Sequence, residues 1–394
     1  MKSLLLRIKF SSSPLWVIFE ISFFRNLAAA SLTAILPLYF KQFVHSDAAV
    51  GMIFFIGYLA SFTSNIYSAH IIQHLKKRKS LLLALIIFTA LFGIFAMAKH
   101  TAVVLLGFAV YQFILSLFVL DVSLYIKHYS NFRQLAQNEG KLGSFSNIGW
   151  VVGPLLGSLI ADAYGFEAVF IFSAAVALIA LITFFFIRLD NEEVKLAHAR
   201  SLAQNIQRFF RDPNMRKTYI NNAGLGFIYT MWDFLPLLMT GIGATIPIIG
   251  LTKTLMGVSQ SIFEYPIGQL ADRQTGERKI FIVGYFLAAL FTIFMGLTTD
   301  LRTFIIFFFV AATGTSFLEM TRDAYFFRQM PEKEVELVSV YRTSDTFPNL
   351  VGQAMAIGVL LFLPVHWLFI IGGSLAFVIF VSNAYALKEL KNPV

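Results

Sequence analysis

Long apolar runs separated by short polar segments dominate the chain. Twelve of these runs are about 20 residues long or longer, which is the length a helix needs to cross a hydrocarbon core about 30 Å thick. None alternates between apolar and polar positions as a transmembrane strand would, so we expect helices rather than a barrel. The twelve expected spans lie near 14–40, 47–72, 80–98, 101–127, 138–163, 167–188, 216–240, 245–271, 279–298, 302–328, 336–363 and 366–387. The first run leads into an intact helix without a small-residue cleavage site, so we interpret it as the first span and not as a signal peptide.

Composition supports this pattern and excludes several classes of protein. Of the 394 residues, 57% are hydrophobic and only 13% are charged, whereas soluble domains carry about 25% charged residues. A set of soluble domains and a disordered chain are therefore both excluded. The absence of Cys removes disulfides, thiolate metal sites and Cys nucleophiles. We expect an all-α integral membrane protein.

The basic residues predict the orientation of the spans. The net charge of +9 comes from short Lys and Arg clusters between the apolar runs, which is typical of a membrane face and not of a nucleic-acid-binding groove. Lys and Arg gather in the N-terminal segment, in 76–79, in 188–217 and in 273–279, whereas the opposite loops hold only Lys41, Lys99 and Arg302. By the positive-inside rule both termini face the cytoplasm, and we expect a multi-pass protein of the cell membrane.

One polar segment divides the chain into two parts of similar length. Residues 190–215 mix charged residues with Leu, Ile and Phe, as in an amphipathic helix on the cytoplasmic membrane surface. A flexible basic linker is the alternative. The expected organisation is an N-terminal bundle over 1–189, this linker, and a C-terminal bundle over 216–394.

The two parts repeat each other. When the chain is compared with itself at an offset of 199 residues, four pairs of Pro and Gly align without gaps, namely Pro14 with Pro213, Pro37 with Pro236, Gly51 with Gly250, and Gly153 with Gly352. A duplication that produces two six-helix bundles explains a single offset. Transporters built from such repeats place the substrate between them, near the midplane of the membrane.

A motif after the eighth expected span resembles the signature of the major facilitator superfamily. Residues 268–279 read GQLADRQTGERK, with one extra residue between Arg273 and Gly276, and the corresponding segment 69–79 reads AHIIQHLKKRK, without the Gly and the Asp. The resemblance implies a fold of twelve helices in two bundles. It also implies a cytoplasmic gate in which Gly268 allows close helix approach and Asp272 accepts hydrogen bonds from a helix N-terminus. The expected gate residues of this motif are Gly268, Asp272, Arg273, Gly276 and Arg278.

A glycine motif on the fifth expected span resembles that of the drug:proton antiporters in the same superfamily. It comprises Gly140, Gly149, Gly153, Pro154 and Gly157, and departs from the family pattern only at the next residue, which is Ser rather than Gly. The spacing places three of the Gly residues on one helix face, where backbones can touch. The resemblance implies export in exchange for protons, and ordinary close packing is the alternative.

Ionisable residues inside the spans are the candidate functional residues, because they are costly in a membrane. Those expected to line a substrate cavity or to carry the coupling proton are Glu20, Arg25, Asp121, Asp233, Lys253, Glu264 and Glu319. At about 1.5 Å per residue, Arg25 lies within about 3 Å of the midplane, within reach of Glu20 or Asp121. Asp233 and Lys253 lie at similar depth and are expected to pair.

The charges near the ends of the tenth and eleventh spans have a different expected role. Arg322, Asp323, Arg342 and Asp345 lie near the cytoplasmic side, close to the expected position of Asp272, and a latch that closes the inner gate is the favoured interpretation. Glu319 is nearer the midplane and is a better candidate for the coupling proton. Glu20 is a second candidate, similar to an early acid in some proton-coupled drug exporters, and Asp121 is a third.

The function predicted from these features is proton-coupled export of a small amphipathic or drug-like molecule. The alternatives are uptake of a metabolite with protons, translocation of a lipid or lysolipid, and a membrane receptor that transports nothing. The 16% aromatic residues are compatible with a lipophilic or cationic substrate, although we expect most Phe to face lipid or to pack between helices. An enzyme is not expected, because no nucleophile, metal set or phosphate loop has convincing spacing. We expect no metal or cofactor other than the proton, a monomer, and membrane lipids and a small substrate as partners.

Overall fold

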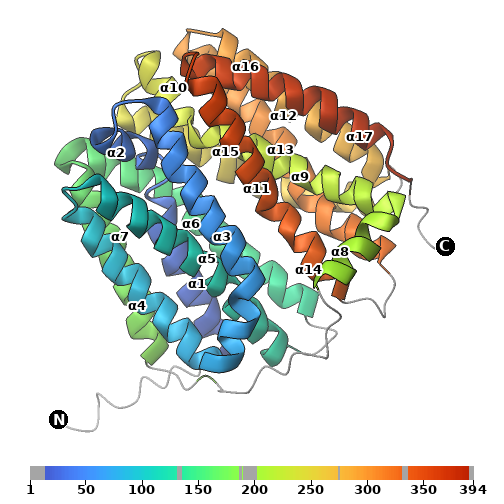
Figure 1. Ribbon diagram of the computed structural model, residues 1–394, viewed down its shortest axis with the longest axis horizontal. Coiled ribbons are helices and arrows are strands. Elements are labelled where there is room, and N and C mark those ends of the chain that lie inside the picture. The colour runs from blue at the N-terminus through green and yellow to red at the C-terminus, as the bar shows by residue number, and fades with distance from the viewer. Residues whose placement is uncertain are drawn as a thin grey trace.

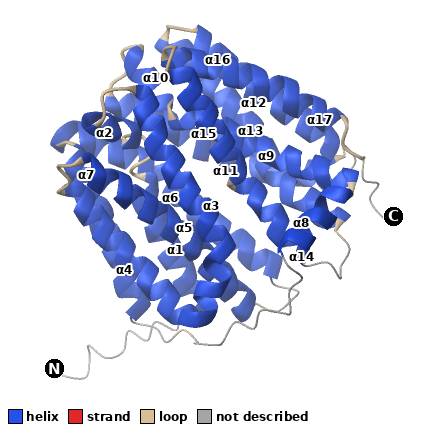
Figure 2. Cartoon of the chain, in the orientation of Figure 1, coloured by secondary structure: helices blue, strands red, loops and turns tan. Residues whose placement is uncertain are grey.

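The computed structural model describes residues 14–130, 135–185, 189, 202–273, 276–330 and 336–389, and within them it contains helices and no strand. Short loops join the helices (Figure 2). The helices before the central polar segment are α1 (Pro14–Ala30), α2 (Leu36–Phe43), α3 (Asp47–Leu75), α4 (Lys77–Ala96), α5 (Thr101–Tyr129), α6 (Leu135–Tyr164) and α7 (Phe166–Phe185). Those that follow are α8 (Leu202–Arg211), α9 (Pro213–Asp233), α10 (Leu235–Gly241), α11 (Ile246–Arg273), α12 (Glu277–Leu297), α13 (Leu301–Gln329), α14 (Glu336–Arg342), α15 (Phe347–Leu360), α16 (Val365–Ala376) and α17 (Ser382–Tyr385).

Nine segments in the described part of the chain are long and apolar enough to cross a membrane. They lie in α3, α4, α5, α6, α7, α11, α12, α13 and the continuous run from α16 to α17. The expected spans 14–40, 216–240 and 336–363 are instead broken, and in each a Pro stands at the start of the next helix, namely Pro37 in α2, Pro236 in α10 and Pro348 in α15. Proline disfavours helical backbone in the residue before it, so a helix tends to end there. The chain is a multi-pass membrane protein.

Contacts fall into two sets that meet along a few helices. α1 packs on α6 and α7, and α3 packs on α5, while α12 packs on α13 and α16, and α9 packs on α15. The main contacts from one set to the other join α6 to α11, α3 to α15 and α2 to α10 (Figure 1). A cavity between these helices would therefore be lined by both parts of the chain.

The contacts at the repeated positions are themselves repeated. Pro14 and Pro213 are the first residues of α1 and α9. A Cβ on Gly51 would lie 3.2 Å from Ile357, and one on Gly250 would lie 1.8 Å from the hydroxyl of Ser158. Ser158 and Ile357 are separated by the same offset of 199 residues as Gly51 and Gly250. Each glycine therefore allows the same close approach between the two parts of the chain.

Capping residues explain where several helices begin. Ser46 accepts from the backbone N–H of Ala49 before α3, and Asp212 accepts from that of Asn214 before α9. Before α13, Asp300 accepts from both the hydroxyl and the backbone N–H of Thr303, which holds the pKa of Asp300 below its usual range. Such side chains satisfy N–H groups that the first turn of a helix leaves without partners.

The turns before α4 and α12 share an unusual backbone conformation. Lys76 has φ 66° and ψ 148°, and Gly276 has φ 69° and ψ 134°. This region is essentially restricted to glycine, which explains Gly276 in the signature motif and makes Lys76 a strained residue. The two turns are 200 residues apart, which is one more than the repeat offset of 199. The one extra residue of the second motif accounts for this difference.

The central polar segment is partly described. Its residues 190–201 lie outside the described residues, and α8 forms the amphipathic helix expected near its end. Phe209 of α8 is fully buried and packs in one cluster with Phe326 and Tyr341. α8 therefore docks on the second part of the chain through this side chain.

Candidate functional site

Close packing with α1 fixes the position of α6. A Cβ on Gly149, Gly153 or Gly157 would lie within 3 Å of α1 atoms or of the turn that follows it, and for Gly157 the distance to the carbonyl oxygen of Ser31 is 1.9 Å. The prediction that these glycines share a face and let two backbones touch is confirmed. Gly140, at the other end of α6, has no atom of the described residues within 4 Å of a Cβ position. Whether the motif marks an antiporter stays a prediction.

Two adjoining cavities lie among the helices of both parts of the chain. Their volumes are about 270 Å³ and about 500 Å³. They share six lining residues, which come from α2, α3, α6, α9 and the turn between α1 and α2, namely Thr33, Leu36, Phe54, Tyr58, Trp150 and Asp233. The walls are mostly apolar with a few polar groups, as is usual for small-molecule sites.

Asp233, the last residue of α9, connects both parts of the chain at these cavities. Its Oδ2 accepts from the hydroxyl of Tyr58 on α3 at 2.9 Å and from Nε2 of Gln353 on α15 at 3.0 Å. Lys253 on α11 lines the smaller cavity with Asp233, but its Nζ donates to the carbonyl oxygen of Trp232 at 2.7 Å. The expected pair therefore shares a cavity without a direct ion pair between the two side chains.

Arg25 lines the larger cavity, and its partners differ from those expected. Its side chain donates to Oδ1 of Asn26 at 2.5 Å, and its guanidinium carbon lies 5.3 Å from the ring centre of Phe88 and 5.2 Å from that of Phe118. Among the described residues Arg25 forms no ion pair with Glu20 or Asp121, so that expectation was wrong. The reason is geometric, because depth along a helix does not specify the direction in which a side chain points.

The remaining acids of the first part lie away from the two cavity walls. Asp121 is fully buried, and its Oδ2 accepts from the hydroxyl of Ser80 at 2.7 Å. Glu20 is half-buried on α1, with no hydrogen bond or ion pair to any described residue. Neither carboxylate lines either cavity.

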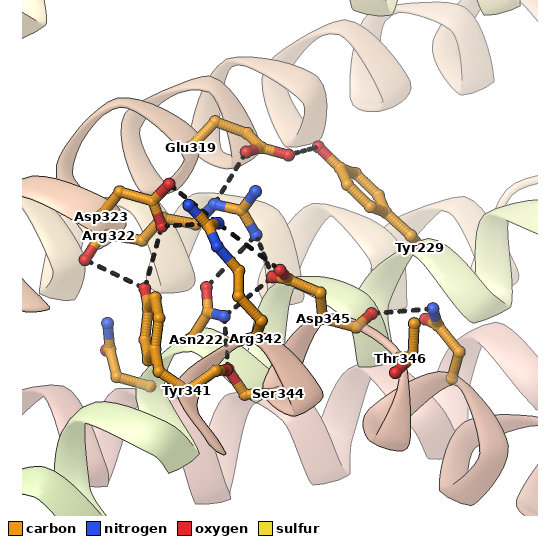
Figure 3. Close-up of polar contacts among 12 residues, drawn as sticks. Asn222, Tyr229, Glu319, Arg322, Asp323, Tyr341, Arg342, Ser344, Asp345 and Thr346 are labelled. Carbon is orange, nitrogen blue, oxygen red and sulfur yellow. Dashed lines mark hydrogen bonds and ion pairs between the residues drawn. The ribbon is translucent and has the colours of Figure 1, made fainter. Parts of the chain in front are cut away.

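The charges of α13 and α14 form a network within the second part of the chain. Arg322 contacts Glu319 at 3.0 Å and Asp345 at 2.9 Å, and Arg342 contacts Asp323 at 3.0 Å. Figure 3 shows the two guanidinium groups among the three carboxylates. Asn222 of α9 also donates to Asp345, at 2.9 Å. The expected latch therefore joins α9, α13, α14 and the turn before α15, and no described ion pair connects it to the first part of the chain.

Glu319 connects this network to the cavity. The hydroxyl of Tyr229 on α9 donates to Oε1 of Glu319 at 3.3 Å (Figure 3), and Tyr229 lines the smaller cavity. Tyr229 and Asp233 are one turn apart on α9. Glu319 therefore lies behind the cavity wall, one side chain away from it.

The signature motif is described in part. Gly276 has the positive φ given above, and Arg278 lies in the first turn of α12. Among the described residues no atom lies within 4 Å of a Cβ position on Gly268, and the expected close helix approach at this residue stays a prediction. The side chains of Glu264, Asp272 and Arg273 lie outside the described residues.

The helices are packed closely at the end where α2 meets α10. There the rings of Phe54 and Phe234 are 5.8 Å apart, and Gly51 and Gly250 make the close contacts described above. At the opposite end, which carries the basic loops, no described atom lies within 4 Å of Cβ positions on Gly140 of α6 or Gly268 of α11. The close packing between α6 and α11 therefore belongs to the α2–α10 end.

Sequence reasoning did not find Tyr58, Gln353 or Gln112, although all three contribute polar groups near the cavities. They are uncharged, and a Tyr or Gln in an apolar span has no distinctive pattern. Tyr58 is seven residues after Gly51, on the helix that packs against α15, and this is the only signal that could have indicated it.

The sequence matches the profile of the Major Facilitator Superfamily over residues 18–245 and 223–393. The chain belongs to this superfamily. Proteins of this superfamily are transporters and not enzymes.

Individual proteins with a similar sequence match only part of the chain. The multidrug resistance protein MdtG of Salmonella arizonae is 30% identical over 164 residues, which cover 39% of this chain and 39% of that protein. MdtG of Salmonella newport has the same identity and coverage. This superfamily member therefore aligns with less than half the length of these relatives.

Solved structures share the fold of this superfamily member. A POT family transporter in complex with a thioalcohol-conjugated peptide has a TM-score of 0.78 at 13% identity, covering 93% of this chain and 94% of that chain. A bacterial homologue of the human lysosomal transporter Spinster has a TM-score of 0.71 at 12% identity, covering 94% and 95%. At such low identity the likeness extends to the fold alone.

Proposed function

We propose that the protein is a secondary active transporter that exports a small amphipathic molecule in exchange for protons. In this proposal the chain crosses the cell membrane twelve times, in two six-helix bundles over 1–189 and 216–394, with both termini in the cytoplasm. The repeated contacts at Gly51 and Gly250 support two related halves that move against each other. The partial match to MdtG and the glycine motif of α6 favour export over uptake.

The observation that carries the proposal is the position of Asp233. Its carboxylate lines both cavities and accepts hydrogen bonds from α3 of one half and α15 of the other. A coupling acid must reach the cavity, and its protonation must change how the halves interact. Among the charged candidates, Asp233 meets both conditions most directly.

The geometry indicates how a proton would act. Without its proton, Asp233 can accept from Tyr58 and Gln353 together, which stabilises the closed α2–α10 end. Protonation removes the negative charge and converts one oxygen into a donor, so the hydrogen bond that joins the halves weakens. An empty, deprotonated carrier is therefore held with its cavity closed on the α2–α10 side, ready to accept substrate from the cytoplasm. This constraint prevents the empty carrier from cycling, as exchange requires.

The test is proton release in everted membrane vesicles that contain the full chain. The vesicles are energised so that their interior becomes acidic, which acridine orange reports, and ethidium, 8-anilinonaphthalene-1-sulfonate and 4-phenylbutyrate are then added separately. We expect at least one probe to dissipate the proton gradient, and Asp233→Asn to abolish this response. Asp162→Asn is the matched control, because Asp162 is exposed near the end of α6 and does not line either cavity.

The other candidate acids are tested in the same assay. If Glu20→Gln, Asp121→Asn or Glu319→Gln abolishes proton release while Asp233→Asn does not, the coupling acid is misassigned although the transporter proposal stands. Proton-driven accumulation of the probes by right-side-out vesicles would instead favour uptake. A chain that moves none of the probes but scrambles a fluorescent lysolipid would support lipid translocation.

A further inference from the structure

The larger cavity contains a buried cation that has no acidic partner. Arg25 is 7% exposed, and among the described residues it contacts no carboxylate. A guanidinium has five N–H donors, and Arg25 directs part of this set to Oδ1 of Asn26 and to the hydroxyl oxygen of Tyr111. Burying a charge without a partner is costly, so a group that persists in this state is expected to receive its counter-charge from elsewhere.

Neutral polar side chains line the same cavity as Arg25. Asn26 and Gln112 are each 8% exposed and Tyr111 is 9% exposed, and all three line the larger cavity with Arg25. Because Oδ1 of Asn26 accepts from Arg25, its Nδ2 donors are directed elsewhere. The side chain of Gln112 has no hydrogen-bond partner among the described residues, although it is more than nine-tenths buried. This part of the wall offers donors that the protein itself does not use.

The charges that face the cavities leave a positive excess. Lys253 adds a second cation, and Asp233 is the acid on the same walls. That carboxylate already accepts from Tyr58 and Gln353. Glu319 is paired with Arg322, and Asp121 is bound to Ser80. No other described carboxylate therefore supplies a counter-charge to Arg25.

The aromatic rings near Arg25 argue against a cationic ligand at this position. Phe88 and Phe118 each lie close to the guanidinium carbon, so those two rings already contact a cation. A second cation would be repelled by Arg25, whereas an oxyanion would form charge-assisted hydrogen bonds with it, in the paired geometry that Arg and carboxylate favour.

We infer that the cavity binds an amphiphile through an oxyanion, a carboxylate or a phosphorus or sulfur oxyanion, held by Arg25 with Asn26 and Gln112. The apolar part of the ligand packs against Phe54, Phe108 and Trp150 on the same cavity walls. This inference rests on the proposed function and narrows its substrate class from amphiphiles in general to anionic or zwitterionic ones.

The test compares three probes that share one phenylbutyl group. The probes are 4-phenylbutyrate, 4-phenylbutylamine and the neutral 4-phenylbutanamide, titrated calorimetrically into the full chain in lipid nanodiscs, with empty nanodiscs as the blank. We expect the carboxylate to bind at least ten-fold more tightly than the amine, which corresponds to about 1.4 kcal/mol. Equal or tighter binding of the amine to the unmodified protein would overturn the inference, whatever the variants show.

Variants assign the preference to Arg25. We expect Arg25→Gln to lose the ten-fold preference for the carboxylate. Binding of the amide by this variant would show that its cavity is intact. Arg25→Lys should keep part of the preference. Arg302→Gln is the control, because Arg302 is exposed at the start of α13 and should leave all three affinities unchanged. An unaltered carboxylate preference in Arg25→Gln would remove Arg25 from the site.

The two proposals fail separately. Proton-driven export of ethidium that does not depend on Arg25, with no carboxylate preference in binding, would leave the transporter proposal standing and overturn the anion site. Tight, Arg25-dependent binding of 4-phenylbutyrate without proton release in vesicles would support the anion site and contradict exchange.

Discussion

At the scale of single residues, the hydroxyl of Tyr58 is the contact through which the first half reaches Asp233. Tyr58→Phe removes this donor and leaves the ring in place. Because a hydrogen bond to a charged group contributes about 1.5–3 kcal/mol, we expect thermal unfolding in detergent at a lower temperature and more frequent opening of the α2–α10 end. Scanning fluorimetry measures the first effect. Labelling of a single Cys placed at Phe54 measures the second, since the chain has no native Cys.

Tyr67→Phe is the matched control for this prediction. Tyr67 is on the same helix, but it is 56% exposed and forms no hydrogen bond with Asp233. Unchanged unfolding and labelling in Tyr58→Phe, relative to Tyr67→Phe, would mean that the hydrogen bond to Asp233 does not hold the halves together.

A second residue-scale prediction concerns the strained backbone at Lys76. Its φ of 66° is shared with Gly276 in the equivalent turn, and such conformations cost non-glycine residues about 1–3 kcal/mol. We expect Lys76→Gly to stabilise the protein by about 1 kcal/mol, after the added flexibility of the unfolded chain is subtracted. Lys79→Gly, within α4, should instead destabilise it. A lower unfolding temperature for Lys76→Gly would contradict the strain.

The sequence identifies the charged residues of the site more reliably than their partners. Arg25, Asp233 and Lys253 are evident as charges in apolar runs, and all three line the cavities. The expected partners were wrong for Arg25 because depth along α1 does not specify the direction in which its side chain points. Side-chain direction depends on helix rotation and tilt, which arise only when helices pack.

At the scale of elements, the contact between α1 and α6 makes glycine necessary at some motif positions and not at others. A Cβ on Gly157 would lie 1.9 Å from the carbonyl oxygen of Ser31, whereas one on Gly140 would have no described atom within 4 Å. We expect Gly157→Ala to push α6 from α1 and destabilise the protein by about 1–3 kcal/mol. Gly140→Ala, in the same helix, should stabilise it by about 0.5–1 kcal/mol.

Unfolding of the two variants by heat in the same detergent measures the difference. Equal effects of the two substitutions would show that the motif does not act through close packing. A loss of proton coupling in Gly157→Ala at unchanged stability would instead assign the motif the antiporter role that its resemblance implies.

The hydrophobic pattern of the sequence did not predict the breaks within three of the expected spans. The positions of Pro37, Pro236 and Pro348 were visible, but hydrophobicity continues across each of them, so a single span was expected. The apolar pattern reports burial in lipid or protein and does not distinguish a continuous helix from two that meet at a turn. Proline supplies that information. The break before α2 also matters for the site, because Leu36 and Pro37, the first residues of α2, line the smaller cavity.

At the scale of the whole molecule, the equivalence of Gly51 with Gly250 and of Ile357 with Ser158 indicates how the halves close. The same small residue, at the same place in each half, meets the same position of the opposite half. Two contacts related in this way form or break together when two rigid bodies rotate about an axis between them. The sequence predicted the repeat from these glycines, but what they touch came only from the packed structure.

Alternating access predicts that the contact between Gly51 and Ile357 must break in every transport cycle. A Cβ on Gly51 lies 3.2 Å from Cγ1 of Ile357, so Gly51→Cys with Ile357→Cys brings two sulfurs close to disulfide geometry. We expect rapid cross-linking by copper phenanthroline and loss of proton release in vesicles, with recovery after reduction. Gly140→Cys with Gly268→Cys is the control, because no atom in the described part of the chain lies within 4 Å of either Cβ position, and it should cross-link much more slowly. Complete cross-linking of α3 to α15 with unchanged transport would show that these helices never separate, and two halves that rotate against each other could not then be the mechanism.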